Sequence, residues 1–283
     1  MSINLFKLSR SFFAEKPVDI IVGIFLLMDS PIKGKFVASP EEILIADTLI
    51  LTSLIKLLIS PGVEKNITPT FLEYFLRKEI SKKFPQDGII GEEFKKRKTK
   101  NGFSWVIDPI DGTRSFIIGS PTWSNLISIS YNNEPILGLV NFPTLKKYYI
   151  TGTNNNSYLV ENNKFKKLKV IKSNSLNNSK IAGNFFGWLT LDEQKKISKL
   201  TKLMRYPCSD ALSYCQLCEG KLNVVLQCYN KIWDIHPMIT LIKNAGGHIT
   251  TWKGKDPKVG GSIIASSSKE LHNKILKMLK PVA

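Results

Sequence analysis

The sequence Trp105-Val-Ile-Asp-Pro-Ile-Asp-Gly-Thr-Arg-Ser-Phe116 predicts a strand, a turn and the start of a helix. Its first three residues are aromatic or β-branched, which is typical of a buried strand. Pro109 fixes its own φ and donates no N–H group, so we expect the strand to stop there and the chain to turn. Gly112 permits backbone conformations that other residues rarely adopt, and Thr113 is well suited to the start of a helix.

Two carboxylates lie within this turn, because Asp108 and Asp111 are three residues apart. Carboxylates at the carboxyl end of a strand, followed by the free N–H groups of a helix start, form a site for a cation beside a phosphate. A turn without a ligand is the alternative, since Asp, Pro and Gly favour turns in any protein. The rest of the chain favours the first interpretation.

The composition is that of a globular protein with a substantial core. The chain has 283 residues, of which 43% are hydrophobic, and its formal net charge is +17 at pH 7. The lysines are spread along the chain among acidic residues, and the sequence has no arginine-rich arm, zinc finger or RNA-binding motif. We therefore expect a generally basic surface that attracts small anions, and no nucleic-acid partner. A nucleic-acid-binding protein is kept as an alternative.

Four cysteines lie close together in the sequence, and they are Cys208, Cys215, Cys218 and Cys228. A four-thiolate zinc site is one interpretation, but the outer spacings do not match those of a zinc ribbon. Reduced thiols in the core are favoured, and they predict a cytoplasmic protein.

Two apolar segments near the N-terminus resemble membrane-directed sequences only weakly. Residues 20–28 are too short to span a bilayer, Asp19 directly precedes them, and no small-residue cleavage site follows. Residues 48–60 contain Lys56, and an amphipathic core helix explains them better. We therefore expect no membrane partner.

Helices and strands alternate along the chain, which predicts an α+β protein built of layers. We expect helices at residues 69–84, 192–204, 211–219, 237–244 and 269–280. Thr68 is suited to cap the first of these. The apolar stripe of that helix is Phe71, Leu72, Phe75, Leu76 and Ile80. We expect strands at residues 89–90, 104–107, 123–131, 136–141, 147–151, 157–160, 181–185, 222–226, 249–252 and 262–265.

Four acidic residues each lie at or just after the end of a short apolar segment, and they are Glu92, Asp108, Asp111 and Asp234. If strands bring them to one edge of a sheet, their ionised carboxylates repel one another unless cations neutralise them. Oxygen ligands without cysteine favour Mg²⁺ over Zn²⁺. Bound Mg²⁺ polarises a phosphate ester and lowers the pKa of water, so no side-chain nucleophile is needed. For any one of these residues, a surface acid at a strand end is the alternative.

Three motifs, in this order and spacing, resemble those of the inositol monophosphatase family of Mg²⁺-dependent phosphatases. They are Gly91-Glu92-Glu93, Asp108-Pro-Ile-Asp-Gly-Thr113, and Trp233-Asp234 followed by Ala245-Gly246-Gly247. The resemblance implies a layered α/β/α/β/α fold, a homodimer and a small anionic phosphate ester as substrate. The Mg²⁺ ligands that it implies are Glu92, Asp108, Asp111, Asp234 and the Ile110 carbonyl group.

The resemblance also implies catalytic and substrate-binding roles. The N–H groups of Gly112 and Thr113 would bind the phosphate, and the Thr113 hydroxyl would orient the attacking water. The implied catalytic residues are Glu92, Asp111 and Thr113. We expect the chain to consist of three segments. Residues 1–40 are an extension of unknown role, residues 41–172 form an α+β half with most metal ligands, and residues 173–283 form an α/β half with Asp234 and the substrate-side residues.

Arg114-Ser115-Phe116 resembles the histidinol-phosphatase branch of the family, since inositol phosphatases usually have Thr-Asn-Phe there. Asp210 and Tyr214 match part of that branch's Asp-Cys-Tyr-x-Tyr segment. The implied substrate-side residues are then Arg114, Asp210 and Gln227. Asp210 would pair with a substrate ammonium group, which histidinol phosphate has and inositol phosphate lacks. A helix cap is the alternative role for Asp210, and inositol-1-phosphatase is the alternative activity.

Three positions depart from the family pattern. Pro69 stands where the family has an aspartate that helps to activate water, and the hydroxyl of Thr68 or Thr70 would be a poorer base. Gln227 replaces a substrate-contacting glutamate, and His236-Pro237 replaces small residues beside the last motif. A metal-binding relative with reduced or lost turnover is therefore a further alternative.

Overall fold

The computed structural model of the chain describes residues 68–152, 155–162, 164–185 and 187–283. These residues belong to one compact unit. The predicted extension at 1–40, the segments at 20–28 and 48–60, and the start of the 41–172 half lie outside the described residues. No helix in the described part of the chain is long and apolar enough to cross a membrane.

Seven strands form the first sheet, and their order in space is their order in the sequence. β1 pairs with β2 in parallel, and each later pair of neighbours is antiparallel. β2 and β3 are buried along nearly their whole length, as expected for strands covered on both faces. The strands are β1 (Gly88–Gly91), β2 (Phe103–Asp111), β3 (Ser124–Tyr131), β4 (Glu134–Phe142), β5 (Lys147–Thr151), β6 (Ser157–Glu161) and β7 (Lys164–Lys167).

Five strands form the second sheet, in the order β11-β12-β10-β8-β9. β12 pairs antiparallel with both β10 and β11, whereas β8 runs parallel to β10 and β9. The strands are β8 (Ile181–Asn184), β9 (Met204–Tyr206), β10 (Val224–Asn230), β11 (His248–Thr251) and β12 (Gly261–Ser266).

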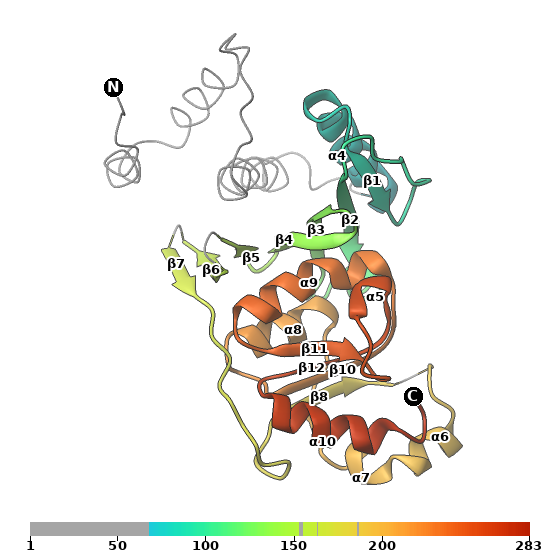
Figure 1. The fold of residues 1–283 in the computed structure, drawn as a ribbon, viewed down its shortest axis with the longest axis vertical. Coiled ribbons are helices and arrows are strands. Elements are labelled where there is room, and N and C mark those ends of the chain that lie inside the picture. Colours follow the sequence, from blue (N-terminus) through green and yellow to red (C-terminus); the bar gives the residue numbers. More distant parts are fainter. Residues whose placement is uncertain (1–67, 153–154, 163, 186) are drawn as a thin grey trace. The chain divides into compact units, whose positions relative to one another are not determined.

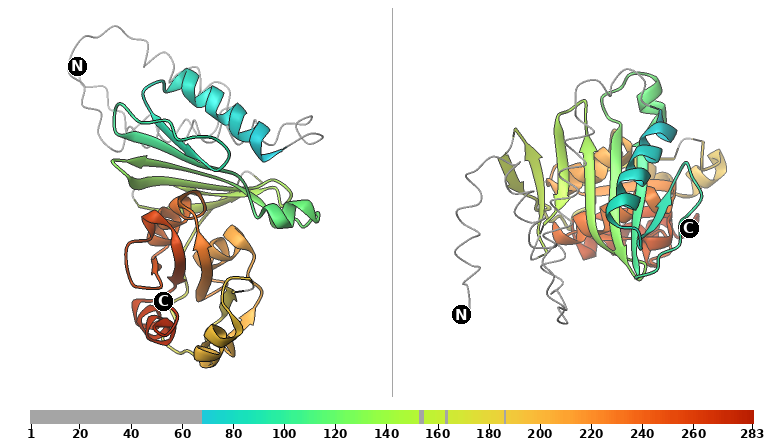
Figure 2. Two further views of the ribbon diagram at one scale, coloured as in Figure 1. Left: turned by 90° about the vertical axis from the view of Figure 1, so that its right-hand side faces the viewer. Right: turned by 90° about the horizontal axis from the view of Figure 1, so that it is seen from above.

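Helices form three layers around the two sheets (Figures 1 and 2). α4 (Pro69–Lys83) covers one face of the first sheet, and α8 (Asp210–Cys218) and α9 (Ile232–Asn244) lie between the sheets. The far face of the second sheet is covered by α6 (Leu191–Lys196), α7 (Ser198–Thr201) and α10 (Lys269–Leu279). The short helices α5 (Thr113–Ile117) and η2 (Pro257–Val259) lie in connections. The predicted layered α/β/α/β/α sandwich is confirmed.

Helix α4 begins as predicted, because the Thr68 hydroxyl accepts a hydrogen bond from the Phe71 N–H group at 3.1 Å. Its predicted apolar stripe is only partly correct. Leu72, Leu76 and Ile80 are buried, but Phe71 is 53% exposed and Glu73 is fully buried in its place. The buried face of α4 therefore includes a charged residue.

The prediction that the strand stops at Pro109 is wrong. β2 continues to Asp111, and its pairing with β3 shifts in register between Asp108 and Asp111. Pro109 is tolerated because the ladder is interrupted where its N–H group would be needed. The Asn125 side chain donates a hydrogen bond to the Pro109 carbonyl at 2.7 Å, so the backbone acceptor of Pro109 has a partner within the protein.

Two predicted helices have other bounds than expected, and one strand was not predicted. The helix expected at 192–204 is divided at Ile197 into α6 and α7, and Met204 begins β9. The helix expected at 237–244 begins at Ile232, so Asp234 lies in its first turn and not at the end of a strand. β7 was not expected, because its four residues are all exposed and show no apolar alternation.

Candidate active site

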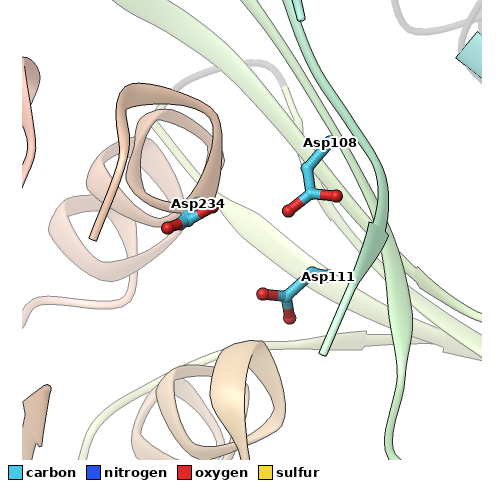
Figure 3. Close-up of side chains that lie close together, drawn as sticks. All are labelled: Asp108, Asp111 and Asp234. Atoms are coloured by element: carbon cyan, nitrogen blue, oxygen red, sulfur yellow. The ribbon is translucent and has the colours of Figure 1, made fainter. Parts of the chain in front are cut away.

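Three carboxylates converge at the end of β2 and the start of α9. Asp108, Asp111 and Asp234 each offer a ligand atom, and these atoms lie within 4.8 Å of one another. Figure 3 shows Asp108 and Asp111 on β2 facing Asp234 on α9. The first sheet and the helical layer beneath it therefore bring together residues more than a hundred positions apart.

Each of these carboxylates is held in place by the surrounding chain, since one oxygen of each accepts a hydrogen bond from a backbone N–H or hydroxyl group. The donors are the Ile110 N–H to Asp108 Oδ1 (2.9 Å), the Ser124 hydroxyl and the Ala211 N–H to Asp111 Oδ2 (both 3.1 Å), and the Lys231 N–H to Asp234 Oδ2 (2.7 Å). These bonds fix the orientation of the carboxylates and leave one oxygen of each uncommitted to them.

The electrostatics of the cluster oppose full ionisation. Burial raises the pKa of Asp108 well above its ordinary value, and the negative charges of Asp111, Asp234 and Glu92 raise it further. Burial is also the main cause that raises the pKa of Asp111, and it raises that of Asp234 to about 6. Ionised carboxylates at this spacing repel one another, and a bound cation would neutralise the repulsion. Since all the donors are oxygen atoms, the residues fit Mg²⁺.

Glu92 lies at the edge of this cluster and is exposed to solvent. Partial burial raises the pKa of its carboxyl group, followed by the charges of Asp234 and Glu93, whereas a hydrogen bond with Asp108 lowers it. The structure thus places Glu92 beside Asp108, outside the tight group of three aspartates.

The turn after β2 contains the remaining residues of the central motif. The Thr113 hydroxyl donates a hydrogen bond to the Ile110 carbonyl at 3.1 Å, so these two groups lie together. Gly112 has a left-handed φ of 75°, and a Cβ atom there would lie 2.8 Å from the Asp210 carboxylate. Glycine is therefore required both by the turn and by the approach of Asp210.

Asp210 lies against this turn from the start of α8. Its φ is 31°, an unusual backbone conformation for a residue other than glycine. Ser209, not Asp210, occupies the N-cap position of α8, so helix capping does not account for Asp210. Burial raises the pKa of the Asp210 carboxyl group, and the nearby positive charge of Arg114 lowers it. Gln227 lies behind Asp210 and donates a hydrogen bond to its carbonyl group at 2.9 Å.

The start of α4 provides no carboxylate at the position of the family's aspartate. Pro69 occupies the first turn of the helix, and the Thr68 hydroxyl is used by the helix cap. The Thr70 hydroxyl instead donates a hydrogen bond to the Glu93 carboxylate at 2.8 Å. Of the two hydroxyls considered above, only that of Thr70 contacts the Gly91-Glu92-Glu93 segment.

His236 is a structural residue. Its ring is 2% exposed, and its nitrogens are hydrogen bonded to the Ser130 hydroxyl (3.1 Å) and the Lys258 carbonyl (2.7 Å). Ser130 lies on β3 and Lys258 in η2, so both ring nitrogens are hydrogen bonded to groups outside the cluster of three aspartates.

The four cysteines are free thiols, three of them buried. Burial raises the pKa of Cys228 to about 12, which favours the neutral thiol. No group of three or more metal-ligating side chains within the described residues includes a cysteine. This agrees with the interpretation as core thiols.

Glu73 is the residue at this site that the sequence patterns did not reveal. It lies on α4, and its carboxylate accepts a hydrogen bond from the Glu93 N–H group at 2.7 Å. The available signal was its spacing from Leu76 and Ile80, which places an acid on the buried face of the helix, with Arg77 four residues later.

Comparison with known proteins matches residues 68–282 to the inositol monophosphatase family. A histidinol-phosphatase of Mycobacterium tuberculosis is 28% identical over 214 residues, which cover 74% of this chain and 81% of that protein. A fructose-1,6-bisphosphatase/inositol-1-monophosphatase of Aquifex aeolicus is 29% identical over 214 residues, which cover 72% of this chain and 77% of that protein.

Solved structures show the same fold. Inositol monophosphatase-II of Staphylococcus aureus aligns with a TM-score of 0.72 at 23% identity, over 84% of this chain and 94% of that one. An inositol monophosphatase from Zymomonas mobilis aligns with a TM-score of 0.71 at 23% identity, over 86% of this chain and all of that one. The family match spans most of the sequence, and the chain therefore belongs to the inositol monophosphatase family, a family of metal-dependent phosphatases.

Proposed function

We propose that this protein is a Mg²⁺-dependent phosphomonoesterase that hydrolyses a small phosphate ester resembling histidinol phosphate. The observation that carries the proposal is the convergence of three aspartates, one buried and two half-buried, with ligand atoms within 4.8 Å of one another, beside the turn that precedes α5. Such a cluster is electrostatically unfavourable without a cation, and the turn places backbone N–H groups next to it.

Mg²⁺ would be held by Glu92, Asp108, Asp111, Asp234 and the Ile110 carbonyl group. When bound, it would polarise the phosphate ester and lower the pKa of a water molecule, so that hydroxide is available at neutral pH. The hydrogen bonds from Ile110, Ser124 and Lys231 support this role, because they hold the carboxylates in place before the ion binds.

The other groups of the central motif would position the reactants. The N–H groups of Gly112 and Thr113 would bind the phosphate oxygens, since the first N–H groups of a helix have no partner within it. The Thr113 hydroxyl, which lies on the Ile110 carbonyl, would orient the attacking water. Glu92 and Asp111 would complete the catalytic group by holding the water-bearing ion.

The substrate class is proposed from Asp210 and its surroundings. Its carboxylate lies beside Gly112, close to where the phosphate would bind, and would pair with an ammonium group of the substrate. Arg114 would contact the phosphate side of the same substrate. Gln227 would act by holding the Asp210 backbone, in agreement with its hydrogen bond. The similarity to a histidinol-phosphatase supports this choice, and the similarity to an inositol-1-monophosphatase supports the alternative.

The test is phosphate release from histidinol phosphate, inositol 1-phosphate and fructose 1,6-bisphosphate, with Mg²⁺ and with EDTA. We expect histidinol phosphate to be preferred and EDTA to abolish release. Preference for inositol 1-phosphate would favour the alternative substrate. No release from a folded protein that binds Mg²⁺ would contradict the proposal and favour a relative without turnover, with Pro69 as the cause. The homodimer and the cytoplasmic location stay predictions.

A further inference from the structure

Helix α4 carries a partly buried ion pair directly behind the Gly91-Glu92-Glu93 segment. The Glu73 side chain is 0% exposed and that of Arg77 is 16% exposed, and Arg77 Nε donates a hydrogen bond to Glu73 Oε1 at 2.7 Å. Burial of a charged pair is unfavourable unless hydrogen bonds satisfy both partners. The other hydrogen bonds of Glu73 and Arg77 therefore show which part of the chain this pair supports.

Both members of the pair contact the segment that contains Glu92. The Glu93 N–H group donates to Glu73 Oε2 at 2.7 Å, and Arg77 Nη2 donates to the Phe94 carbonyl at 3.1 Å. The Arg77 guanidinium also lies 5.6 Å from the centre of the Phe94 ring, a cation–π distance. These contacts fix the backbone immediately after Glu92.

The backbone immediately before Glu92 is fixed by close approach. A Cβ atom at Gly91 would lie 2.1 Å from a carboxylate oxygen of Glu73, which is far too close for any real contact. The segment can therefore lie against the ion pair only because residue 91 is glycine. Glu73 thus lies against the chain both before and after Glu92, and Arg77 contacts it after Glu92.

Glu73 does not replace the acid that is absent at Pro69. One of its oxygens is used by Arg77 and the other by the Glu93 N–H group. The contacts of this carboxylate are those of a residue that supports its neighbours, not of a ligand.

We propose that Glu73 and Arg77 are positioning residues that hold Glu92 beside Asp108 and thereby set the affinity of the site for Mg²⁺. This inference rests on the proposed function, because it takes Glu92 to be a metal ligand. Loss of the partners that orient ligand residues typically weakens metal binding about 10- to 100-fold.

The experiment measures the Mg²⁺ dissociation constant without substrate, from the rise of the thermal unfolding midpoint with Mg²⁺ concentration. Glu73→Gln preserves the size of the side chain and removes the charge that holds Arg77. Arg77→Lys is a milder change, which keeps the charge but lacks the planar group that reaches Glu73 and Phe94 together. Gly91→Ala displaces the pair without altering either charge. We expect each variant to raise the dissociation constant about tenfold or more.

The matched control is Glu270→Gln on α10. Glu270 and Lys274 form a pair with the same four-residue spacing and an N–O distance of 2.6 Å, but both side chains are exposed. We expect this change to leave the Mg²⁺ dissociation constant unaltered. A folded Glu73→Gln or Arg77→Lys protein with a lower unfolding midpoint and an unaltered dissociation constant would overturn the inference. Absence of any Mg²⁺ effect on the unsubstituted protein would overturn the proposed metal site and the inference with it.

Discussion

Two regions of the molecule bury titratable side chains in opposite ways. His272 on α10 is 4% exposed, and its two ring nitrogens are hydrogen bonded to the hydroxyls of Ser266 (2.7 Å) and Thr250 (2.9 Å). Burial, followed by the charge of His248, lowers its pKa to about 4, so the ring is neutral at pH 7. In the acidic cluster, burial and like charges raise the pKa values of the carboxyl groups instead.

The difference separates a buried group that the chain itself satisfies from a group that requires a ligand. A neutral imidazole with a hydrogen bond at each nitrogen needs nothing further, and it contributes to stability. Three carboxylates within 4.8 Å repel one another, and the hydrogen bonds to them orient but do not neutralise them. Substitutions in the two regions are therefore expected to affect different properties.

Asp111→Asn should produce the largest change. We expect turnover to fall roughly a thousandfold, which corresponds to a loss of about 4 kcal/mol of transition-state stabilisation, because the change removes a charged metal ligand. The free energy of unfolding in EDTA should not fall, because the change also removes a repulsive charge. Phosphate release and denaturant unfolding measure the two effects. The control is Asp192→Asn, since Asp192 is exposed and pairs with Lys195, and near-normal turnover in Asp111→Asn would refute the site assignment.

Lowering the pH should reduce the contribution of His272 to the free energy of unfolding. Its folded-state pKa of about 4 lies below the ordinary value of 6.5, so the unfolded chain takes up the proton first. The stability that the neutral ring contributes is thus complete above pH 6.5 and is lost as the pH falls toward 4. We expect a loss of up to about 3 kcal/mol. Denaturant unfolding of wild type and His272→Gln between pH 4 and 7.5 isolates this contribution, and parallel curves for the two proteins would contradict it.

Mg²⁺ should stabilise the protein more at pH 7.5 than at pH 5. The folded-state pKa of Asp234, about 6, lies above its ordinary 3.8, so in the absence of metal stability is lost as the pH rises through this interval. Mg²⁺ at a hundred times its dissociation constant should add about 2.7 kcal/mol at pH 7.5. At pH 5, protons compete for the same oxygens. Thermal unfolding at both pH values tests this, and equal stabilisation would argue against a carboxylate site.

Asp210→Asn should have the smallest effect, and only on one substrate class. A hydrogen bond to a charged group contributes about 1.5–3 kcal/mol, so kcat/KM for histidinol phosphate should fall at least about tenfold. Inositol 1-phosphate lacks an ammonium group and serves as the internal control. Equal losses with both substrates would show that Asp210 supports the site in general and does not select the substrate.

The local sequence predicted the elements whose residues carry their own signal. The cap at Thr68, the strand at 147–151 and the closing helix of the chain agree with the structure, because caps, aromatic and β-branched composition and helical periodicity are local properties. The expected end of the strand at Pro109 was wrong, since a shift in register against β3 accommodates a residue without an N–H group. Strand pairing is not encoded in neighbouring residues.

The sequence also predicts a metal site, because carboxylates at four separate positions repel one another, once they are brought together, unless a cation neutralises them. What the sequence by itself determined is the layered fold, the family and the candidate ligands, because these depend on residue types and their order. Only the tertiary structure decided that Asp234 approaches β2 from a helix, and that Glu73 and Arg77 lie behind Glu92. The physical reason is that such contacts join residues distant along the chain, and packing between layers, not local preference, brings them together.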